Sequence, residues 1–382
     1  MFALSMNQRR LIELILRRGE IARVDLAQLS GMTGASVTRL VGELVDKGLL
    51  TEEVERNGAQ GQPRRLLRLK PKSHISAGIT FSVSRMEIAL IDLPGTVLST
   101  HSVEIEAATI HGVADAAMTE LTAMLAETNL PHTAVVGIGC SVPGNFGTDA
   151  NFFNAHPLFP AFEDSMAIER LRESFELPCF VENDGTAASL GEYLFNRSLP
   201  IADPLFFIHI GHGVGGGAVI GGKPYRGANG NASLTGVLFP YDKSRPSGQD
   251  LLTTLDRAGF SVRDFLDIDQ LPSTAQTVMD AWIERAGAQL RHAVRVASGL
   301  FDPAVIVIGG RLPAAINQAL LDRILAEPIE GPSRGLTVAP VTASALGPRA
   351  GAYGAASIPF FETFLSGAVQ DLGNAYLNGR KT

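Results

Sequence analysis

The sequence predicts an α/β protein in two parts, a small and largely helical head followed by a larger body of alternating strands and helices. Three observations support this. Residues 1–72 carry 13 Lys and Arg against 8 Asp and Glu, whereas the rest of the chain carries 19 against 31. Apolar residues recur at helical spacing in the head. Beyond residue 74 they form short runs separated by helical segments. With 382 residues, 45% of them hydrophobic, the chain can form two or three packed domains.

Three short helices are expected in the head, over residues 7–18, 23–29 and 33–47. Thr33 is placed to cap the third helix, and Gly48 to end it. The apolar residues expected to face inward are Leu11, Ile12, Leu14, Ile15, Leu16, Val24, Leu26, Ala27, Leu29, Val37, Leu40, Val41, Leu44 and Val45. A tight turn between the second and third helices makes them a helix-turn-helix.

Two extended stretches, residues 49–54 and 65–69, follow the helices, and the polar linker 57–64 joins them into a hairpin. A helix-turn-helix places the start of its second helix in the major groove of DNA, and arginines on a wing suit the narrow minor groove. The predicted DNA contacts are therefore Thr33, Ser36, Thr38 and Arg39 on the helix, and Gln62, Arg64 and Arg65 on the wing. Each can meet a base or a phosphate, and the linker can also be a polar loop without contacts.

The body begins after Pro71 and Ser73 with a strand pair over residues 75–92. Further strands are expected at 135–140, 179–182, 205–210 and 304–308, and helices at 112–129, 165–175 and 276–298. Three motifs lie at strand ends. Glu182-Asn183-Asp184-Gly185 precedes a helix, Gly211-His212-Gly213 opens a glycine-rich turn, and Gly309-Gly310-Arg311 ends the last strand. Such turns let backbone amides approach phosphate or sugar.

Together these motifs resemble the ROK family, which groups repressors, open reading frames and sugar kinases, and the resemblance covers essentially the whole chain. It implies the two-lobed actin-like or sugar-kinase fold (ribonuclease H-like, α/β), preceded by a winged helix-turn-helix domain. The expected domains are 1–72 for DNA binding, 73–184 for the first lobe and 185–357 for the second. A C-terminal helix over 358–382 would complete the first lobe. The resemblance also implies a homodimer or homotetramer, with the second lobe as the oligomerisation region.

The resemblance assigns Asn183 and Asp184 to sugar contacts, since they match the family's Glu-Asn-Asp motif. Gly144 matches a turn on the sugar side of the cleft, and Asn154 matches an asparagine nearby. Gly309 and Gly310 match glycines on the nucleotide side. Asp184 corresponds to the catalytic base of the kinases and is a vestigial candidate here, although it could simply cap the following helix. The predicted ligand-binding residues are Gly144, Asn154, Asn183 and Asp184.

Other positions depart from the kinase pattern. Where the kinases have Asp-x-Gly-Gly-Thr for phosphate and magnesium, this chain has Thr80-Phe81-Ser82-Val83-Ser84. Leu234 and Val237 replace a sugar-binding glutamate and a zinc-binding histidine. The expected zinc loop, residues 242–250, has no cysteine, although Asp250 falls near a final sugar-binding glutamate. The sequence therefore predicts no enzyme activity, no catalytic residue, no metal and no cofactor.

Five remaining residues need an interpretation, and four of them have both a structural and a functional one. Cys140 and Cys179 lie in apolar runs and are expected to be small buried residues rather than a disulfide or zinc site. His209 and His212 flank a glycine turn and are either structural or ligand contacts, while Trp282 is expected to pack in the core. With two cysteines and no apolar run long enough to cross a membrane, the chain is expected to be cytoplasmic.

These observations predict a DNA-binding transcriptional regulator, a repressor of sugar-related genes, whose degenerate kinase cleft senses a sugar or sugar derivative. Its partners would be a double-stranded DNA operator, the effector and further copies of itself, but no membrane. One alternative is an ATP-dependent sugar kinase of the glucokinase or N-acetylglucosamine kinase type. Another is a constitutive DNA-binding scaffold with an inactive cleft.

Overall fold

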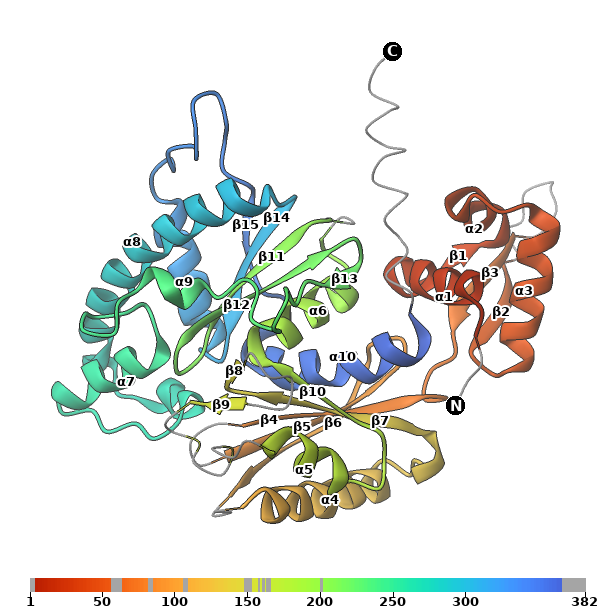
Figure 1. Cartoon of the computed structure of the whole chain (residues 1–382), viewed down its shortest axis with the longest axis horizontal. Coiled ribbons are helices and arrows are strands. Elements are labelled where there is room, and N and C mark those ends of the chain that lie inside the picture. Colours follow the sequence, from red (N-terminus) through yellow and green to blue (C-terminus); the bar gives the residue numbers. More distant parts are fainter. Residues whose placement is uncertain are drawn as a thin grey trace.

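The computed structural model consists of a head beside a body built on two five-stranded sheets (Figure 1). The structure describes residues 4–55, 64–81, 85–105, 109–147, 153–156, 159, 162, 166–199 and 202–365. In these ranges no helix combines the length and the apolar character needed to cross a bilayer.

The head contains the three predicted helices and the hairpin. Its elements are α1 (Met6–Arg18), β1 (Ile21–Ala22), α2 (Arg23–Ser30), α3 (Gly34–Asp46), β2 (Leu50–Glu55) and β3 (Arg64–Leu69). The strands form an antiparallel sheet in the order β1-β3-β2. Thr33 caps α3 as predicted, because its hydroxyl oxygen accepts a hydrogen bond of 3.2 Å from the amide of Ser36.

The prediction that Val24 faces the core is wrong. Its side chain is 78% exposed, and Val45 at the end of α3 is also exposed. On the short helix α2, Leu26 and Ser30 define the buried side. Val24 precedes Leu26 by two residues, so it lies nearly opposite on the helix. The other predicted apolar positions of α1 and α3 are buried.

The first lobe has a mixed sheet in the order β10-β7-β4-β5-β6. Its strands are β4 (Ile75–Phe81), β5 (Arg85–Asp92), β6 (Val97–Glu104), β7 (Val135–Val142) and β10 (Cys179–Asn183), with a small ribbon of β8 (Gly144–Phe146) and β9 (Phe153–Ala155). Helices α4 (Ile110–Glu127) and α5 (Ala167–Glu173) lie on one side of this sheet (Figure 1). Strand β6 was not anticipated, because its residues are mostly half-buried at the sheet edge and show no apolar run.

The second lobe has a sheet in the order β13-β12-β11-β14-β15. Its strands are β11 (Leu205–Ile210), β12 (Val214–Ile220), β13 (Lys223–Pro224), β14 (Val305–Gly310) and β15 (Val341–Ala343). Its outer helices are α7 (Gly248–Arg257), α8 (Gln276–Phe301) and α9 (Ala314–Leu325). Short 3-10 helices occur at His132–Ala134, Thr235–Leu238, Phe265–Gln270, Ser273–Ala275 and Gly347–Arg349.

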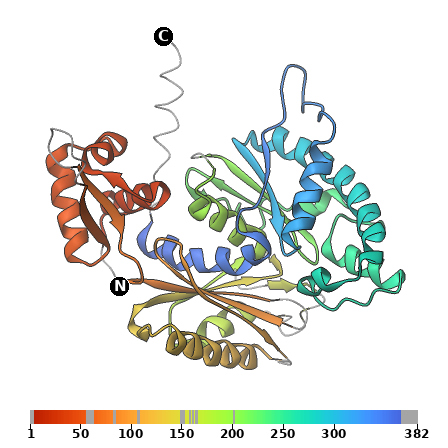
Figure 2. The same ribbon diagram turned by 180° about the vertical axis from the view of Figure 1, so that it is seen from behind.

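Two helices, α6 (Asp184–Phe195) and α10 (Ala350–Phe364), lie between the two sheets (Figures 1 and 2). Helix α10 packs on β4 and β7, α6 packs on β11 and β12, and the two helices pack on each other. Glycine permits this proximity. A Cβ on Gly78 would lie 2.0 Å from the Ala352 carbonyl oxygen, and one on Gly354 would lie 2.4 Å from the Ala187 carbonyl oxygen.

The C-terminal helix begins earlier than the sequence indicated. It was expected over 358–382, but it starts at Ala350 and passes through Pro359, and residues 366–382 lie outside the described part. Nearly every residue of α10 is buried, so its first turns lack the one-sided apolar pattern by which a helix is recognised. The division of the body at residues 184 and 185 stays a prediction.

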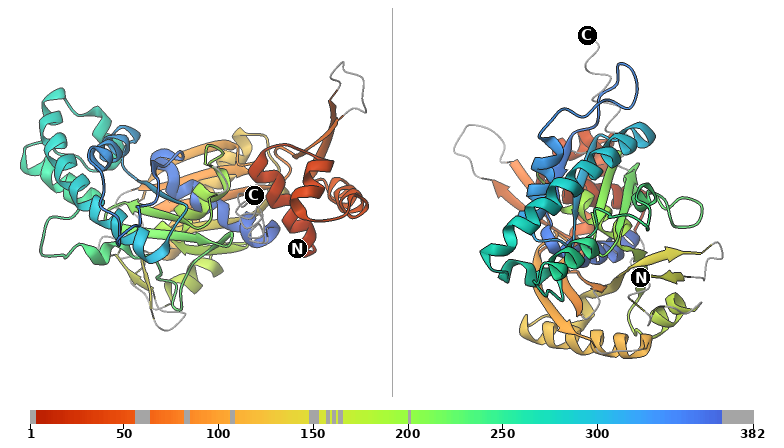
Figure 3. Two further views of the ribbon diagram at one scale, coloured as in Figure 1. Left: turned by 90° about the horizontal axis from the view of Figure 1, so that it is seen from above. Right: turned by 90° about the vertical axis from the view of Figure 1, so that its left-hand side faces the viewer.

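The head is attached to the body through α1, which is buried against both (Figure 3, left). Leu11, Ile12 and Leu16 belong to one continuous apolar cluster with Tyr193 of α6 and Phe364 of α10. A guanidinium nitrogen of Arg9 donates to the carbonyl oxygens of Glu362 at 3.2 Å and Leu365 at 3.1 Å. The Arg17 guanidinium lies 3.9 Å from the centre of the Tyr193 ring. The head is therefore packed directly onto the ends of the two central helices.

Candidate nucleic-acid interface and inter-lobe cleft

The predicted reading surface lies at the start of α3. Thr33, Thr38 and Arg39 are exposed there, while Ser36 is half-buried. The Thr33 oxygen caps the helix, and the Arg39 guanidinium forms an ion pair with Glu43 one turn along. An exposed pair of this kind contributes little to stability. Arg39 can therefore exchange Glu43 for a phosphate or a guanine edge at small expense.

The wing is described only at its base. Arg65 on β3 is exposed and its guanidinium lies 3.3 Å from a carboxylate oxygen of Glu52. Arg64 opens the same strand, but its side chain lies outside the described part, as does all of Gln62. Contact between the wing and DNA stays a prediction for all three residues.

The positive charge of the head does not all face one way. Arg9 and Arg17 are directed at the body, as described above. Arg68 is held by Glu20 and Glu53 on the outer side of the small sheet. The excess of basic residues counted from the sequence therefore overstates the charge available to DNA, because part of it fixes the head to the body.

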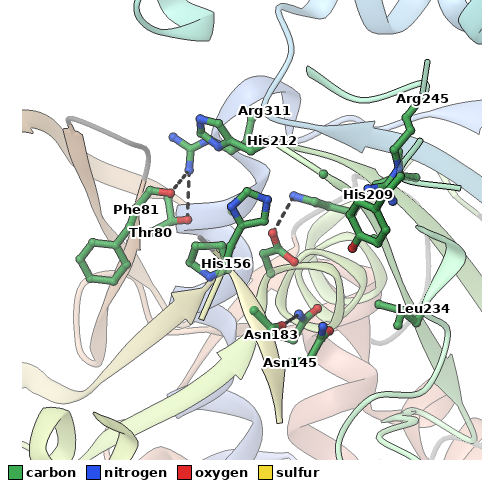
Figure 4. Close-up of a pocket in the computed structure, with 18 residues that line it drawn as sticks. Thr80, Phe81, Asn145, His156, Asn183, His209, His212, Leu234, Arg245 and Arg311 are labelled. Carbon is green, nitrogen blue, oxygen red and sulfur yellow. Dashed lines mark hydrogen bonds and ion pairs between the residues drawn. The ribbon is translucent and has the colours of Figure 1, made fainter. Parts of the chain in front are cut away.

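A cleft lies between the two lobes at the start of α6 and α10 (Figure 4). About 760 Å³ of space without protein atoms lies among its lining residues, and this space includes open solvent. The described residues that line it are Thr80, Phe81, Pro143, Gly144, Asn145, His156, Asn183, Asp184, His209, His212, Gly213, Val214, Gly215, Leu234, Tyr241, Arg245, Arg311 and Gly351. Three of the four predicted ligand-binding residues are therefore brought together.

Asn183 and Asp184 lie where β10 ends and α6 begins. The Asn183 carboxamide donates to the Gly144 carbonyl oxygen at 2.7 Å and accepts from the Gly185 amide at 2.9 Å, so it caps α6 and fixes the Gly144 turn. One oxygen of Asp184 also accepts from Gly185, at 2.8 Å. The other lies 3.4 Å from Nε2 of His209. Asp184 therefore accepts a hydrogen bond in the first turn of α6 and also lines the cleft, and its contact with a ligand stays a prediction.

The structure does not bring Asn154 into the cleft. It lies exposed on β9, opposite Asn145 of β8. Its carbonyl oxygen lies 2.4 Å from where a Cβ of Gly144 would be, and Gly144 has φ 151°. Two positions further along, His156 lines the cleft instead. A ligand contact by Asn154 stays a prediction without support from this geometry.

Three histidines surround the cleft, and burial lowers the pKa of each. The pKa of His212 falls to about 3, and the pKa values of His209 and His156 are also lowered despite the nearby Asp184 carboxylate. These rings are therefore neutral near pH 7 and act as hydrogen-bonding groups rather than as charges. Neither ring nitrogen of the buried His209 makes a hydrogen bond within the described part of the chain.

Arg311 connects the two lobes. It follows β14, is 6% exposed, and reaches across to the first lobe (Figure 4). Its guanidinium donates to the Phe81 carbonyl oxygen at 2.8 Å and pairs with the Glu87 carboxylate at 3.2 Å. Burial raises the pKa of Glu87, and Arg311 opposes that shift. In the sequence, Arg311 stands out only as the last residue of the Gly309-Gly310-Arg311 motif. The unusual feature was an arginine following a fully apolar strand.

Asp250 does not reach the cleft. Its carboxylate accepts a hydrogen bond of 2.9 Å from Nε1 of Trp282 and pairs with Arg285. Trp282 is therefore a buried packing residue, as predicted, and it also holds Asp250 in place. Within the described residues, no group of three or more His, Cys, Asp or Glu could hold a metal ion. Cys140 is buried, and its sulfur lies 3.8 Å from that of the half-buried Cys179.

Comparisons with known proteins agree in both parts of the chain. Residues 76–244 match the model of the ROK family, and residues 6–51 match that of winged helix-turn-helix DNA-binding domains. The uncharacterized protein y4fQ of Sinorhizobium fredii (strain NBRC 101917 / NGR234) is 60% identical over 99% of this chain and 96% of its own length. The N-acetylglucosamine repressor of Escherichia coli O157:H7 is 23% identical over 85% of this chain and 84% of its own.

Among solved structures, a ROK family transcriptional regulator described as a homologue of the E. coli MLC protein aligns with a TM-score of 0.65 and 22% identity. The alignment covers 96% of this chain and 97% of that one. The similarity thus extends through the head as well as the body, and it confirms the predicted fold of a winged helix-turn-helix on a two-lobed α/β body.

Proposed function

This chain belongs to the ROK family, and on that basis we propose that it is a DNA-binding repressor that responds to a sugar or sugar derivative. The observation that carries the proposal is the exposed N-terminal part of α3 on a winged head, joined to an inter-lobe cleft. The N-acetylglucosamine repressor shares most of its length with this chain. Such a function places the protein with the DNA, which in a bacterium is the cytoplasm.

We infer that phosphoryl transfer is not the output of the cleft. Where the kinase pattern places its phosphate-binding acid and glycines, this chain has Thr80 and Phe81. The Arg311 guanidinium binds this segment instead, since it donates to the Phe81 carbonyl oxygen and lies 3.4 Å from the Thr80 hydroxyl. Leu234 in place of a sugar-binding glutamate and Val237 in place of a zinc-binding histidine support the same inference. Asp184 and the glycine-rich turns at the strand ends favour the kinase alternative.

The proposed route from the cleft to the head runs along α6 and α10. Helix α6 begins at Asp184 in the cleft and carries Tyr193 beneath Arg17 of the head. Helix α10 has Gly351 in the cleft, and its C-terminal carbonyl groups accept from Arg9. Because the two helices touch backbone to backbone, a change in the lobe angle would move them together. A ligand that prefers one angle would then shift the position of the head.

We propose that the repressor acts as a homodimer or homotetramer joined through the second lobe. Large apolar side chains are exposed there, including Val237 at 79% and Leu300 at 75%. Both residues line the same apolar groove. Exposed apolar groups that gather in this way are typical of subunit contacts. Two heads held at a fixed separation would read two half-sites of one operator.

Genome-wide occupancy of the tagged chain identifies its operator, and mobility-shift assays on that sequence test the head. We expect Arg39→Ala, and Arg64→Ala combined with Arg65→Ala, to weaken binding and reduce its salt dependence. Arg334→Ala, an exposed arginine of the second lobe, is the control. Unchanged affinity and salt slope in both head variants would remove the reading surface from the proposal.

The kinase alternative is tested by ATP turnover across a panel of hexoses and N-acetylhexosamines. We expect none above background. Sugar-dependent turnover that disappears in Asp184→Asn would establish the kinase and reject the inference that the cleft only senses.

A further inference from the structure

Among the residues that the structure describes, one cation of the cleft has no partner of opposite charge. Arg245 lines the cleft from the second lobe. One guanidinium nitrogen donates to the Gly236 carbonyl oxygen at 3.2 Å, and the guanidinium lies 4.1 Å from the centre of the Tyr241 ring. Its Nε is buried and has no hydrogen-bond partner among the described residues. Tyr241 and the Gly236 carbonyl thus hold the guanidinium in place without neutralising it.

The other charged groups of the cleft are already engaged. The buried Arg311 pairs with Glu87, so it contributes little net charge. Asp184 is the only carboxylate among the described lining residues, and it faces His209 and the start of α6 rather than Arg245. The histidines are neutral, as shown above. Asn183 and Asp184 form a polar, hydrogen-bonding side of the cleft. Arg245 forms a cationic side, and Figure 4 shows it apart from Asn183.

The residues around Arg245 have lost groups that would bind neutral hydroxyls. Leu234 lines the cleft with an apolar side chain, Val237 is turned outward, and Asp250 is held by Trp282 and Arg285. None of these offers an acceptor for a hydroxyl group in this half of the cleft. A guanidinium offers several donors in one plane, and this arrangement matches the paired oxygens of a carboxylate or a phosphate.

We propose that the effector is an anionic sugar derivative, whose carboxylate or phosphate binds Arg245 while its hydroxyl groups contact Asp184. This rests on the proposed function and specifies its ligand. The ligand supplies the missing negative charge for the half-buried guanidinium of Arg245.

Binding is tested on the full chain by thermal shift and titration calorimetry, with matched sets of probes. Each set holds a neutral sugar, its uronate and its 6-phosphate, built on glucose, galactose and N-acetylglucosamine. We expect at least one anionic probe to raise the midpoint of unfolding while its neutral parent does not. The uronate and the 6-phosphate of each set distinguish a carboxylate from a phosphate.

The variants locate the anion. Arg245→Ala should lower the affinity for the anionic probe by about 10-fold or more, since a charge-assisted contact is lost. Arg245→Lys keeps the charge without the planar fork and should be intermediate. Lys243→Ala is the control, because this exposed cation belongs to the same loop but does not line the cleft. The midpoint of each variant without ligand shows whether it is folded.

Three results overturn the proposal: equal shifts by neutral and anionic probes, unchanged anion affinity in a folded Arg245→Ala variant, or no shift with any anionic probe. DNA binding is measured separately without ligand. A repressor that binds its operator but is released by neutral sugars therefore rejects the anionic effector while leaving the proposed function intact.

Discussion

The surface that faces DNA and the cleft between the lobes use the same kinds of side chain in opposite settings. On the head, Arg39 and Arg65 form exposed pairs with Glu43 and Glu52. In the cleft, Arg311 and Glu87 form a pair that is almost wholly buried. Water and salt screen the first kind, so these arginines can change partner readily. The second kind cannot lose one member without leaving a buried charge. The arginines of the head can therefore exchange a carboxylate for a phosphate, whereas the Arg311–Glu87 pair keeps the two lobes in one arrangement.

The largest expected effect is at the buried pair. Arg311→Ala should lower the free energy of unfolding by about 3–5 kcal/mol, because it leaves the Glu87 carboxylate without its partner in a buried site. Urea unfolding followed by circular dichroism measures it. The double variant Arg311→Ala/Glu87→Gln should recover part of the loss. A loss below about 1 kcal/mol in the single variant would contradict the distinction between the two kinds of pair.

The next effect is a pH dependence of stability at the cleft. The pKa of His212 is about 3 in the folded protein against about 6.5 when unfolded, so the unfolded chain binds the proton first. The neutral His212 ring makes its full contribution to the free energy of unfolding above pH ~6.5. That contribution decreases as the pH falls toward 3, by up to about 1.4 kcal/mol per pH unit. Unfolding at pH 7.5, 6 and 5 measures it.

His212→Gln provides the comparison, because buried carboxyls such as Glu87, Glu182 and Glu192 have raised pKa values and oppose the trend. The variant should show a shallower loss of stability toward low pH than the parent. If stability falls with pH in parallel in the two proteins, His212 takes up its proton as readily in the folded state as in the unfolded state, which contradicts the prediction.

On the head, the pair between Arg39 and Glu43 gives a smaller effect with a predictable sign. Glu43→Gln frees Arg39 from its partner and should strengthen operator binding, while Arg39→Ala should weaken it by about 1–3 kcal/mol if it meets a base. Fluorescence anisotropy at several salt concentrations measures both. Unfolding stability should change by under 1 kcal/mol in either variant. A large loss of stability would show that the head pair is structural after all.

The smallest expected change tests the link between the two regions. Arg17→Ala removes the guanidinium from the Tyr193 ring and should lower stability by about 0.5–1 kcal/mol. Its more informative effect is on regulation, since effector and operator should each still bind while the effector releases DNA less completely. Arg18→Ala, an exposed neighbour, is the control. Full release in Arg17→Ala would exclude this contact from the route along α6.

Much of the head could be predicted because its structure depends on neighbours in the sequence. The spacing of Leu40, Val41 and Leu44, and the capping hydroxyl of Thr33, specify α3 within a few residues. The wrong predictions also concern single elements of the chain. Val24 was placed inward on a helix too short for its periodicity to be read, and α10 had no polar face to mark its start.

By itself the sequence determined the winged head, the alternating body and the family motifs, including the place of Asn183 and Asp184 at the start of a helix. Only the tertiary structure decided what surrounds them. Arg311 contacts Thr80, 231 residues away, and His156 and Arg245 reach the same cleft from other loops. The tertiary structure also decided that Arg9 and Arg17 contact the body instead of facing DNA. The physical reason is that the spacing of side chains along one helix or strand is set locally. Contacts across the cleft depend on how two sheets pack against α6 and α10, and a linear pattern does not encode that packing directly.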